Sequence, residues 1–77
     1  MTALSQEKIS QEFPGYKIHV KKYGFLLQKK HWLMIKTDRQ GVCWGLGLKR
    51  GPRYPWNKLD VFFKDLKEEM EVFFYTR

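Results

Sequence analysis

Positive charge and rigid turns are concentrated in one short stretch of the sequence, GLKRGPRYPWNKL, residues 47–59. Its two prolines restrict their neighbours to turns and extended conformations, so the loop loses little entropy when Lys49, Arg50 and Arg53 engage a partner. The stretch also leads into the N-terminus of a predicted helix, where free backbone amides favour anions. These features together predict a loop, residues 49–58, that binds phosphate.

Two aromatic residues of this loop have two interpretations each. Tyr54 and Trp56 could present flat faces on which bases or cations stack, or they could pack beneath the loop and hold it to the core. For Trp56 the second role would be that of a hydrophobic staple at the start of the next helix. Tyr23 and Trp32 are further candidates for stacking.

Catalytic chemistry has a narrower basis in this sequence. His19 and His31 could act with Arg50, Arg53 or Tyr54 as acid, base and phosphate clamp in a metal-independent ribonuclease. No Gly-rich phosphate loop is present, the carboxylates lack histidines at metal-ligand spacing, and Cys43 has no base nearby in the sequence. We therefore expect a protein without catalytic residues, bound metal or cofactor, and keep the ribonuclease as an alternative.

Charge is segregated along the chain. The 77 residues carry 15 Lys and Arg against 8 Asp and Glu, a formal net charge of +7. Residues 17–58 hold eleven of these cations and only one acid, Asp38, whereas both flanking segments are net negative. Such segregation predicts a positive face that attracts polyanions over about 8–10 Å at physiological salt. The alternative is a solvated surface that keeps a small domain soluble.

Length and composition predict one small domain, residues 1–77. Three Trp, four Tyr and six Phe supply much of the core that so short a chain can bury. Cys43 is the only cysteine, which excludes an internal disulfide and a zinc site built on cysteines. The sequence has no apolar run long enough for a signal peptide or a membrane span, so we expect a cytoplasmic protein that binds no membrane.

The chain begins with a predicted helix. A short helix is expected over residues 5–13, with Ser5 as its N-cap and with Leu4 and Ile9 as a hydrophobic staple. A Pro-Gly pair ends it, because proline cannot continue the hydrogen-bond ladder.

Alternation of apolar and polar residues predicts the first strand. In YKIHVKKYG, apolar side chains occupy one face, and Lys17, His19 and Lys21 occupy the other. The next segment, residues 25–38, is either one long bent strand or the end of the first strand, a turn and the second strand. A further turn is expected at TDRQG, where Gly41 suits a left-handed position.

The third strand is expected over residues 42–48 and has two dissimilar faces. One face is apolar up to Leu48 and would pack on the core, and the other is nearly bare and consists of Cys43, Gly45 and Gly47. Glycines inside a strand have two interpretations: an aromatic side chain packs across them, or they face a ligand.

The clearest element is a C-terminal helix, in which apolar residues recur at spacings of three and four. Asn57 is its expected N-cap, with Asp60 placing a carboxylate in the first turn. Trp56 and Val61 occupy the staple positions. Residues 72–77 either continue the helix or leave it as an extended tail.

These elements predict an α+β domain: a short N-terminal helix, a three-stranded antiparallel sheet and a C-terminal amphipathic helix packed on one face of the sheet, in the order α-β-β-β-α. The opposite face of the sheet is then left to solvent. On the expected parity it carries Lys17, His19, Lys21, Tyr23, Trp32, Met34 and Lys36, with Lys49 beside Gly45 and Gly47.

This order of elements resembles known nucleic-acid-binding folds over most of the chain. Three strands followed by one helix are similar to the arm-type domains of tyrosine recombinases and to the plant AP2 domains, which lay a sheet in the DNA major groove. Helix, three strands and helix are similar to double-stranded RNA-binding domains. The lysine cluster that opens the second helix of those domains is not reproduced, because KRGPRYPWNK is interrupted by proline. The resemblance is one of element order, and it implies nucleic-acid binding.

We therefore predict a small basic protein that binds RNA or DNA, mainly through phosphates, by a basic sheet face and the loop of residues 49–58. Two alternatives stay open: docking on an acidic protein surface, as an inhibitor, adaptor or small subunit would, and the ribonuclease. An unpaired edge strand could also join two copies of the chain. The predicted nucleic-acid-binding residues are Lys17, Lys21, Tyr23, Trp32, Lys49, Arg50, Arg53 and Tyr54.

Overall fold

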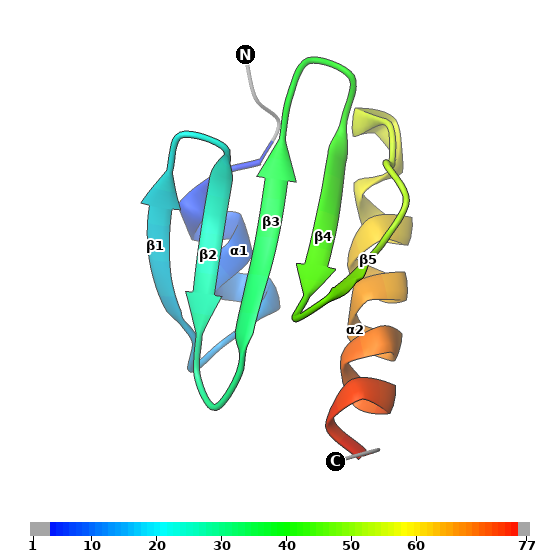
Figure 1. Ribbon diagram of the computed structural model, residues 1–77. Coiled ribbons are helices and arrows are strands. Elements are labelled where there is room, and N and C mark those ends of the chain that lie inside the picture. The colour runs from blue at the N-terminus through cyan, green and yellow to red at the C-terminus, as the bar shows by residue number, and fades with distance from the viewer. Residues whose placement is uncertain (1–3, 76–77) are drawn as a thin grey trace.

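The computed structural model describes the backbone of residues 4–75 and the side chains of residues 4–73. A five-stranded antiparallel sheet forms its centre, and its strands lie in the order in which they follow one another in the sequence (Figure 1). One helix precedes the sheet, and a 3-10 turn and a longer helix follow it. The elements are α1 (Gln6–Glu12), β1 (Lys17–Lys21), β2 (Gly24–Gln28), β3 (Trp32–Thr37), β4 (Val42–Leu46), β5 (Lys49–Arg50), η1 (Trp56–Lys58) and α2 (Leu59–Tyr75).

The α+β class is as predicted, but the prediction of three strands is wrong, because the sheet has five. The chain turns back after Lys21 and continues as β2, and a turn at residues 29–31 separates β2 from β3. Gly24 makes the first reversal feasible, since its φ is +145° and a Cβ there would collide with the carbonyl of Ile35 in β3. Two strands therefore occupy the segment that could also have formed one long bent strand.

The other additional strand, β5, exists because the chain turns at Gly47, whose φ of +60° is left-handed. The third predicted strand consequently ends at Leu46. Leu48 was expected on the packed face; it lies instead in the turn, with an exposed fraction of 103%. The ring of Phe73 lies against Gly47, where a Cβ would be 3.6 Å away from it. Of the two interpretations of the strand glycines, aromatic packing is correct for Gly47.

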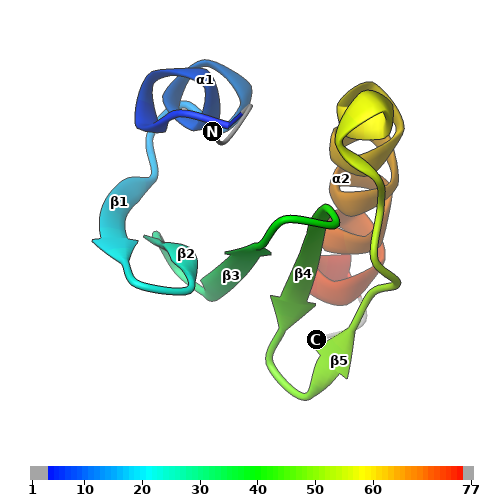
Figure 2. The ribbon, with the colours of Figure 1, turned by 90° about the horizontal axis from the view of Figure 1, so that it is seen from above.

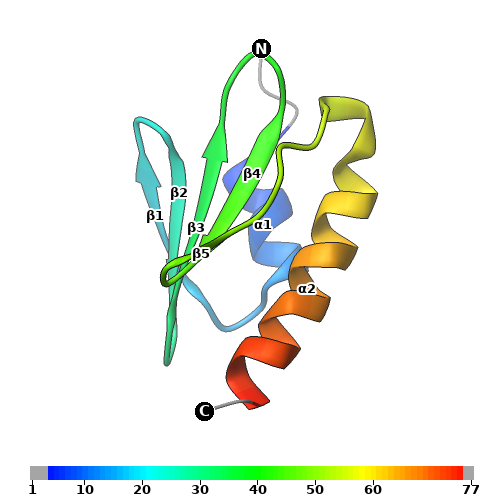
Figure 3. The same ribbon diagram turned by 45° about the vertical axis from the view of Figure 1, so that its right-hand side comes forward.

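Both helices lie on the same side of the sheet and leave the other side uncovered (Figures 2 and 3). The core lies between the helices and the sheet, and within the described residues it buries no polar or charged residue. Its fourteen members come from the N-terminal segment, the sheet and α2: Leu4, Ile9, Phe13, Phe25, Leu27, Leu33, Ile35, Val42, Trp44, Leu46, Phe62, Phe63, Leu66 and Met70.

The first helix begins as predicted. The backbone N–H of Lys8 donates to Ser5 Oγ over 3.1 Å, so Ser5 is the N-cap. Leu4 and Ile9, the predicted staple pair, are 3% and 0% exposed.

The start of α2 differs from the prediction. Residues 56–58 form a 3-10 turn, and Pro55 occupies its N-cap position without a side-chain hydrogen bond. Asn57 therefore lies inside the turn and is not the N-cap. The physical reason is a 3-10 hydrogen bond: the N–H of Lys58 donates to the carbonyl of Pro55 over 2.9 Å. The helical segment therefore begins at Trp56, before the position at which Asn57 could act as a cap.

The predicted staple of Trp56 and Val61 is also wrong. The indole N–H of Trp56 donates to the carbonyl of Asp38 over 2.8 Å, and Val61 is 38% exposed. Trp56 is partly buried against the core and holds the loop to the β3–β4 turn, which is the packing role considered for it. At its other end α2 continues to Tyr75, so the described part of residues 72–77 is helical; residues 76 and 77 lie outside the described residues.

Candidate nucleic-acid interface

The register of the strands shows which side chains share the uncovered side of the sheet. Directly paired residues of antiparallel strands point to the same side, and successive residues of a strand alternate between the sides. Because Leu27, Ile35 and Trp44 belong to the core, the residues of the alternate parity face away from the helices. We call this surface the open face; it consists of Lys17, His19, Lys21, Gly24, Leu26, Gln28, Trp32, Met34, Lys36, Cys43, Gly45 and Arg50.

Four cations lie on the open face: Lys17, Lys21, Lys36 and Arg50. All four are exposed, and within the described residues none of them makes an ion pair. Seven of the eight carboxylates lie in α1 or α2, and the eighth, Asp38, lies in the β3–β4 turn at the edge of the face, where it pairs with Arg53. The fold thus converts the charge segregation of the sequence into a basic sheet face opposite an acidic layer of helices.

Lys49 does not belong to the open face, and its expected position there is wrong. It pairs with Leu46, a core residue, and therefore points to the helix side, where its ammonium group forms an ion pair with Glu69 of α2. The turn at Gly47 is the cause. A third strand that continued through residue 49 would have placed Lys49 on the open face, but the turn starts a new strand in which Lys49 points to the helix side. Arg50, the next residue, pairs with Gly45 and points to the opposite side.

Gly45 is one of the residues that line a small pocket at the β4–β5 end of the open face. The pocket has a volume of about 230 Å³, and its other lining residues are Met34, Lys36, Cys43, Trp44, Gly47, Arg50, Gly51 and Arg53. A Cβ at Gly45 would make only ordinary contacts, 3.8 Å from Met34 Cβ and 3.9 Å from the carbonyl oxygen of Lys49, so no aromatic ring packs across this residue. Aromatic packing is therefore not the reason for Gly45, and the ligand-facing interpretation stays a prediction.

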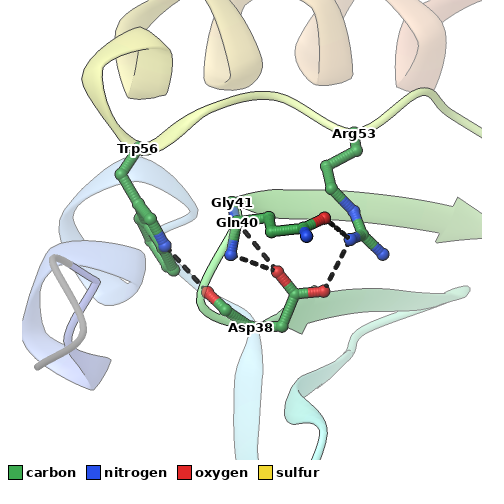
Figure 4. A network of polar contacts seen from close by, with 5 residues as sticks. All are labelled: Asp38, Gln40, Gly41, Arg53 and Trp56. Carbon is green, nitrogen blue, oxygen red and sulfur yellow. Dashed lines mark hydrogen bonds and ion pairs between the residues drawn. The ribbon is translucent and has the colours of Figure 1, made fainter.

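Arg53 reaches this pocket from the loop and is held in place by the β3–β4 turn. Its Nη1 lies 3.0 Å from Asp38 Oδ2 and donates to Gln40 Oε1 over 2.9 Å (Figure 4). The other carboxylate oxygen of Asp38 accepts from the backbone N–H groups of Gln40 and Gly41, at 2.8 and 3.0 Å. Arg53 is therefore oriented but partly neutralised, whereas Arg50 retains its full charge.

The loop is anchored to the sheet through Tyr54. The backbones of Val42 and Tyr54 exchange two hydrogen bonds, 2.8 and 2.7 Å long. Gly41 has a φ of +157°, and a Cβ there would collide with the carbonyl of Tyr54. The predicted turn glycine is therefore required, because the loop backbone crosses directly above it.

The side chain of Tyr54 packs against α2 and is not placed for stacking on a ligand. Its hydroxyl donates to Asp65 Oδ2 over 2.7 Å, and its ring meets Phe62 edge-on, with centroids 5.5 Å apart. Burial, together with the hydrogen bond to Asp65, raises the pKa of Tyr54 above its ordinary value. Of the two interpretations of Tyr54, the structure supports packing.

Trp32 is the aromatic side chain that the open face presents to solvent. It is 50% exposed, and its ring stacks on that of His19 with centroids 6.2 Å apart and an interplanar angle of 28°. Tyr23 lies in the β1–β2 turn, at the rim of the face, and is 36% exposed. The structure thus brings together Lys17, Lys21, Trp32 and Arg50 of the predicted set, with Tyr23 and Arg53 at the margin.

Lys36 was missing from the predicted binding residues. The available signal was its parity, since residues 32, 34 and 36 of one strand must share a face. The pocket around Gly45 was not predictable in this way, because it depends on the loop that brings Arg53 to the edge of the sheet.

The two histidines of the ribonuclease alternative are not brought together. His19 lies on the open face under Trp32. His31 lies in the β2–β3 turn, and its ring meets Phe73 of α2 edge-on, with centroids 5.6 Å apart. An acid–base pair needs both groups within reach of the same substrate atoms, and these rings contact opposite sides of the sheet.

Neither a metal cluster nor a membrane-spanning helix is found in the part of the chain that the structure describes. No group of three His, Cys, Asp or Glu side chains there could hold a metal ion. No helix there combines the length and the apolar character needed to cross a membrane.

Comparisons with known proteins gave no relative. The chain matches no family model, no curated protein and no solved structure. Charge, exposure and geometry of the open face are therefore the basis for inferring function.

Proposed function

We propose that this protein binds nucleic acid through the open face, with Lys17, Lys21, Lys36 and Arg50 contacting phosphates. The observation that carries the proposal is that these four exposed cations share one uncovered face without an acid among them. Each cation that neutralises a phosphate releases a condensed counterion, and this release drives the binding of polyanions.

The arrangement of charge within the domain supports the same proposal. Several cations of the helix side are neutralised by ion pairs: Lys8 and Lys67 contact Glu12, and Lys49 contacts Glu69. Surface pairs of this kind contribute about 0–1 kcal/mol each, but they cancel charge locally. A polyanion that approaches the domain therefore meets attraction on the open face and a mixed field, rich in carboxylates, on the helix side.

Salt dependence tests the proposal. Binding of an RNA or DNA oligomer to the wild-type protein should weaken with salt, with a log-log slope of about −3 to −4 for four phosphate contacts. Lys36→Gln with Arg50→Gln should reduce the magnitude of this slope by about two. Lys58→Gln with Lys64→Gln is the matched control, because it changes the net charge equally at exposed positions outside the open face; its slope should stay near the wild-type value.

Three results would count against the proposal. Absence of any binding at low salt rejects it outright. Equal loss of slope in both double variants shows that net charge, and not the open face, drives association. Competition by poly-glutamate as strong as that of an oligonucleotide of the same charge assigns the face to acidic proteins instead.

A further inference from the structure

The open face is too wide for the major groove of a duplex. Its five strands span four inter-strand spacings, about 19 Å from β1 to β5. The major groove of B-DNA is about 12 Å wide and admits a helix or a two-stranded ribbon. The insertion mode implied by the resemblance to three-stranded DNA readers is therefore unsuitable for this sheet.

Trp32 offers a stacking surface that only an unpaired base can use. His19 supports one face of the indole, and half of the side chain's surface is exposed. The ladder between β3 and β4 ends at the pair of Leu33 and Leu46, so no β4 residue lies opposite Trp32 in the register. Bases of a duplex are stacked on one another and do not present their faces, whereas those of a single strand do.

The centre of the open face is an uncharged row of residues that lies between Trp32 and Lys36 and forms part of the pocket lining. Leu26, Met34 and Gly45 pair across β2, β3 and β4 in one row, and both Leu26 and Met34 are half-buried. A duplex backbone would place phosphates over this strip and gain no cation there. The flat faces of unpaired bases match it better, because they are apolar.

The pocket at Gly45 suits a phosphate group. Its volume of about 230 Å³ is below the roughly 300–1,000 Å³ of cavities that hold whole cofactors. Arg50 and Lys36 flank it, and the contacts of Arg53 to Asp38 and Gln40 both use Nη1, which leaves the N–H groups at Nη2 and Nε for a ligand. Trp32 and Lys36 are four residues apart in β3, about 13 Å, a span that a short strand of nucleotides can cover.

We propose that the ligand of the open face is single-stranded RNA or DNA, with one base stacked on Trp32 and a backbone phosphate in the pocket at Gly45. This inference rests on the proposed function and narrows it to a substrate class. Duplex binding through backbone contacts is the competing outcome.

The experiment compares affinities for a single-stranded oligomer of about ten nucleotides and for the blunt duplex of the same sequence. The single strand should bind at least about tenfold more tightly than the duplex. Trp32→Ala should weaken single-strand binding by about tenfold or more at an unchanged salt slope, and Trp32→Phe should retain most of the affinity. Leu48→Ala is the control, because it removes an exposed apolar side chain that lies in the β4–β5 turn and not on the open face.

Fluorescence provides a second readout that needs no substitution at Trp32. In a Trp56→Phe background, the exposed tryptophan is Trp32, since Trp44 is 4% exposed. Its emission should be quenched by the single strand and not by the duplex. Equal affinities for the two ligands, with no effect of Trp32→Ala and no quenching, would overturn the inference and leave the proposed function in place. Failure to bind either ligand would overturn both.

Discussion

Gly45 and Arg50 lie directly opposite each other in the β4–β5 ladder, and Gly45 has no side chain to fill the space beside the arginine. Both residues line the pocket on the open face. It is also the point at which stability and binding can be separated by substitution.

Gly45→Ala should fold at least as well as the wild type. The φ of Gly45 is not positive, and the added Cβ makes ordinary contacts, so the variant should gain about 0.4–1 kcal/mol through a less flexible unfolded chain. Gly45→Leu should fill the pocket and weaken nucleic-acid binding several-fold. Melting curves and binding isotherms of the two variants check this; a Gly45→Leu protein that is folded and binds like the wild type would show that the pocket is unused.

Gly41→Ala should be strongly destabilising. The new Cβ would collide with the carbonyl of Tyr54, and a φ of +157° is unfavourable for alanine, so we expect a loss of more than about 1 kcal/mol, or at least about 4–8 °C in Tm. Thermal unfolding measures it, with Gly45→Ala as the matched control. An unchanged Tm would mean that the loop does not cross Gly41 as described.

Tyr54→Phe should lower stability by about 0.5–1.5 kcal/mol at neutral pH, because the hydrogen bond to Asp65 is lost. The raised pKa of Tyr54 also has an alkaline consequence: the folded protein keeps a proton that the unfolded chain releases near pH 10. Stability from this group is present below that pH and is lost as the pH rises further. The variant should therefore show a shallower alkaline decline.

Denaturant titrations across the alkaline range test this, with Tyr23→Phe as the control at an exposed site. Part of the decline should persist in Tyr54→Phe, since burial also raises the pKa of Tyr16. Identical alkaline profiles for wild type and Tyr54→Phe would be incompatible with the partly buried hydroxyl bound to Asp65.

Glu12→Gln should remove part of the acid sensitivity of the fold. Hydrogen bonds from Lys67 and then Lys8 lower the pKa of Glu12, so its contribution to stability is present above the ordinary glutamate pKa and is lost as the pH falls through the lowered value. At neutral pH the variant should lose up to about 1 kcal/mol. Urea titrations below and above pH 4 provide the measurement. Glu68→Gln is the control, and equal acid profiles for the two variants would contradict the link between α1 and α2.

Local patterns predicted both helices and the start of α1, but not the start of α2 or the number of strands. The cap at Ser5 and the staple of Leu4 and Ile9 depend on residues within one turn of each other, so the sequence alone indicates them. The strand breaks depend on contacts between strands. Gly24 is required by the approach of Ile35, eleven positions further along the chain, and no periodicity reveals such a contact.

The same difference separates the correct site residues from the wrong ones. Lys17, Lys21 and Trp32 follow from strand alternation. The side chains of Lys49 and Tyr54 are positioned by Glu69 and Asp65 of α2, 20 and 11 residues away, and these partners turn them toward the helices. The turn at Gly47 shifts the alternation of side chains by one residue. Arg50 therefore lies on the open face in place of Lys49, which was expected there.

The most direct test of the central claim uses these adjacent cations, which point to opposite sides of the sheet. Arg50→Gln and Lys49→Gln remove the same charge one residue apart, and the affinity for nucleic acid is measured across a salt series for both. If nucleic acid binds the open face, Arg50→Gln reduces the magnitude of the log-log salt slope by about one and weakens binding. The affinity and the salt slope of Lys49→Gln then stay close to those of the wild type. Equal effects of the two substitutions, or a larger effect of Lys49→Gln, would contradict it.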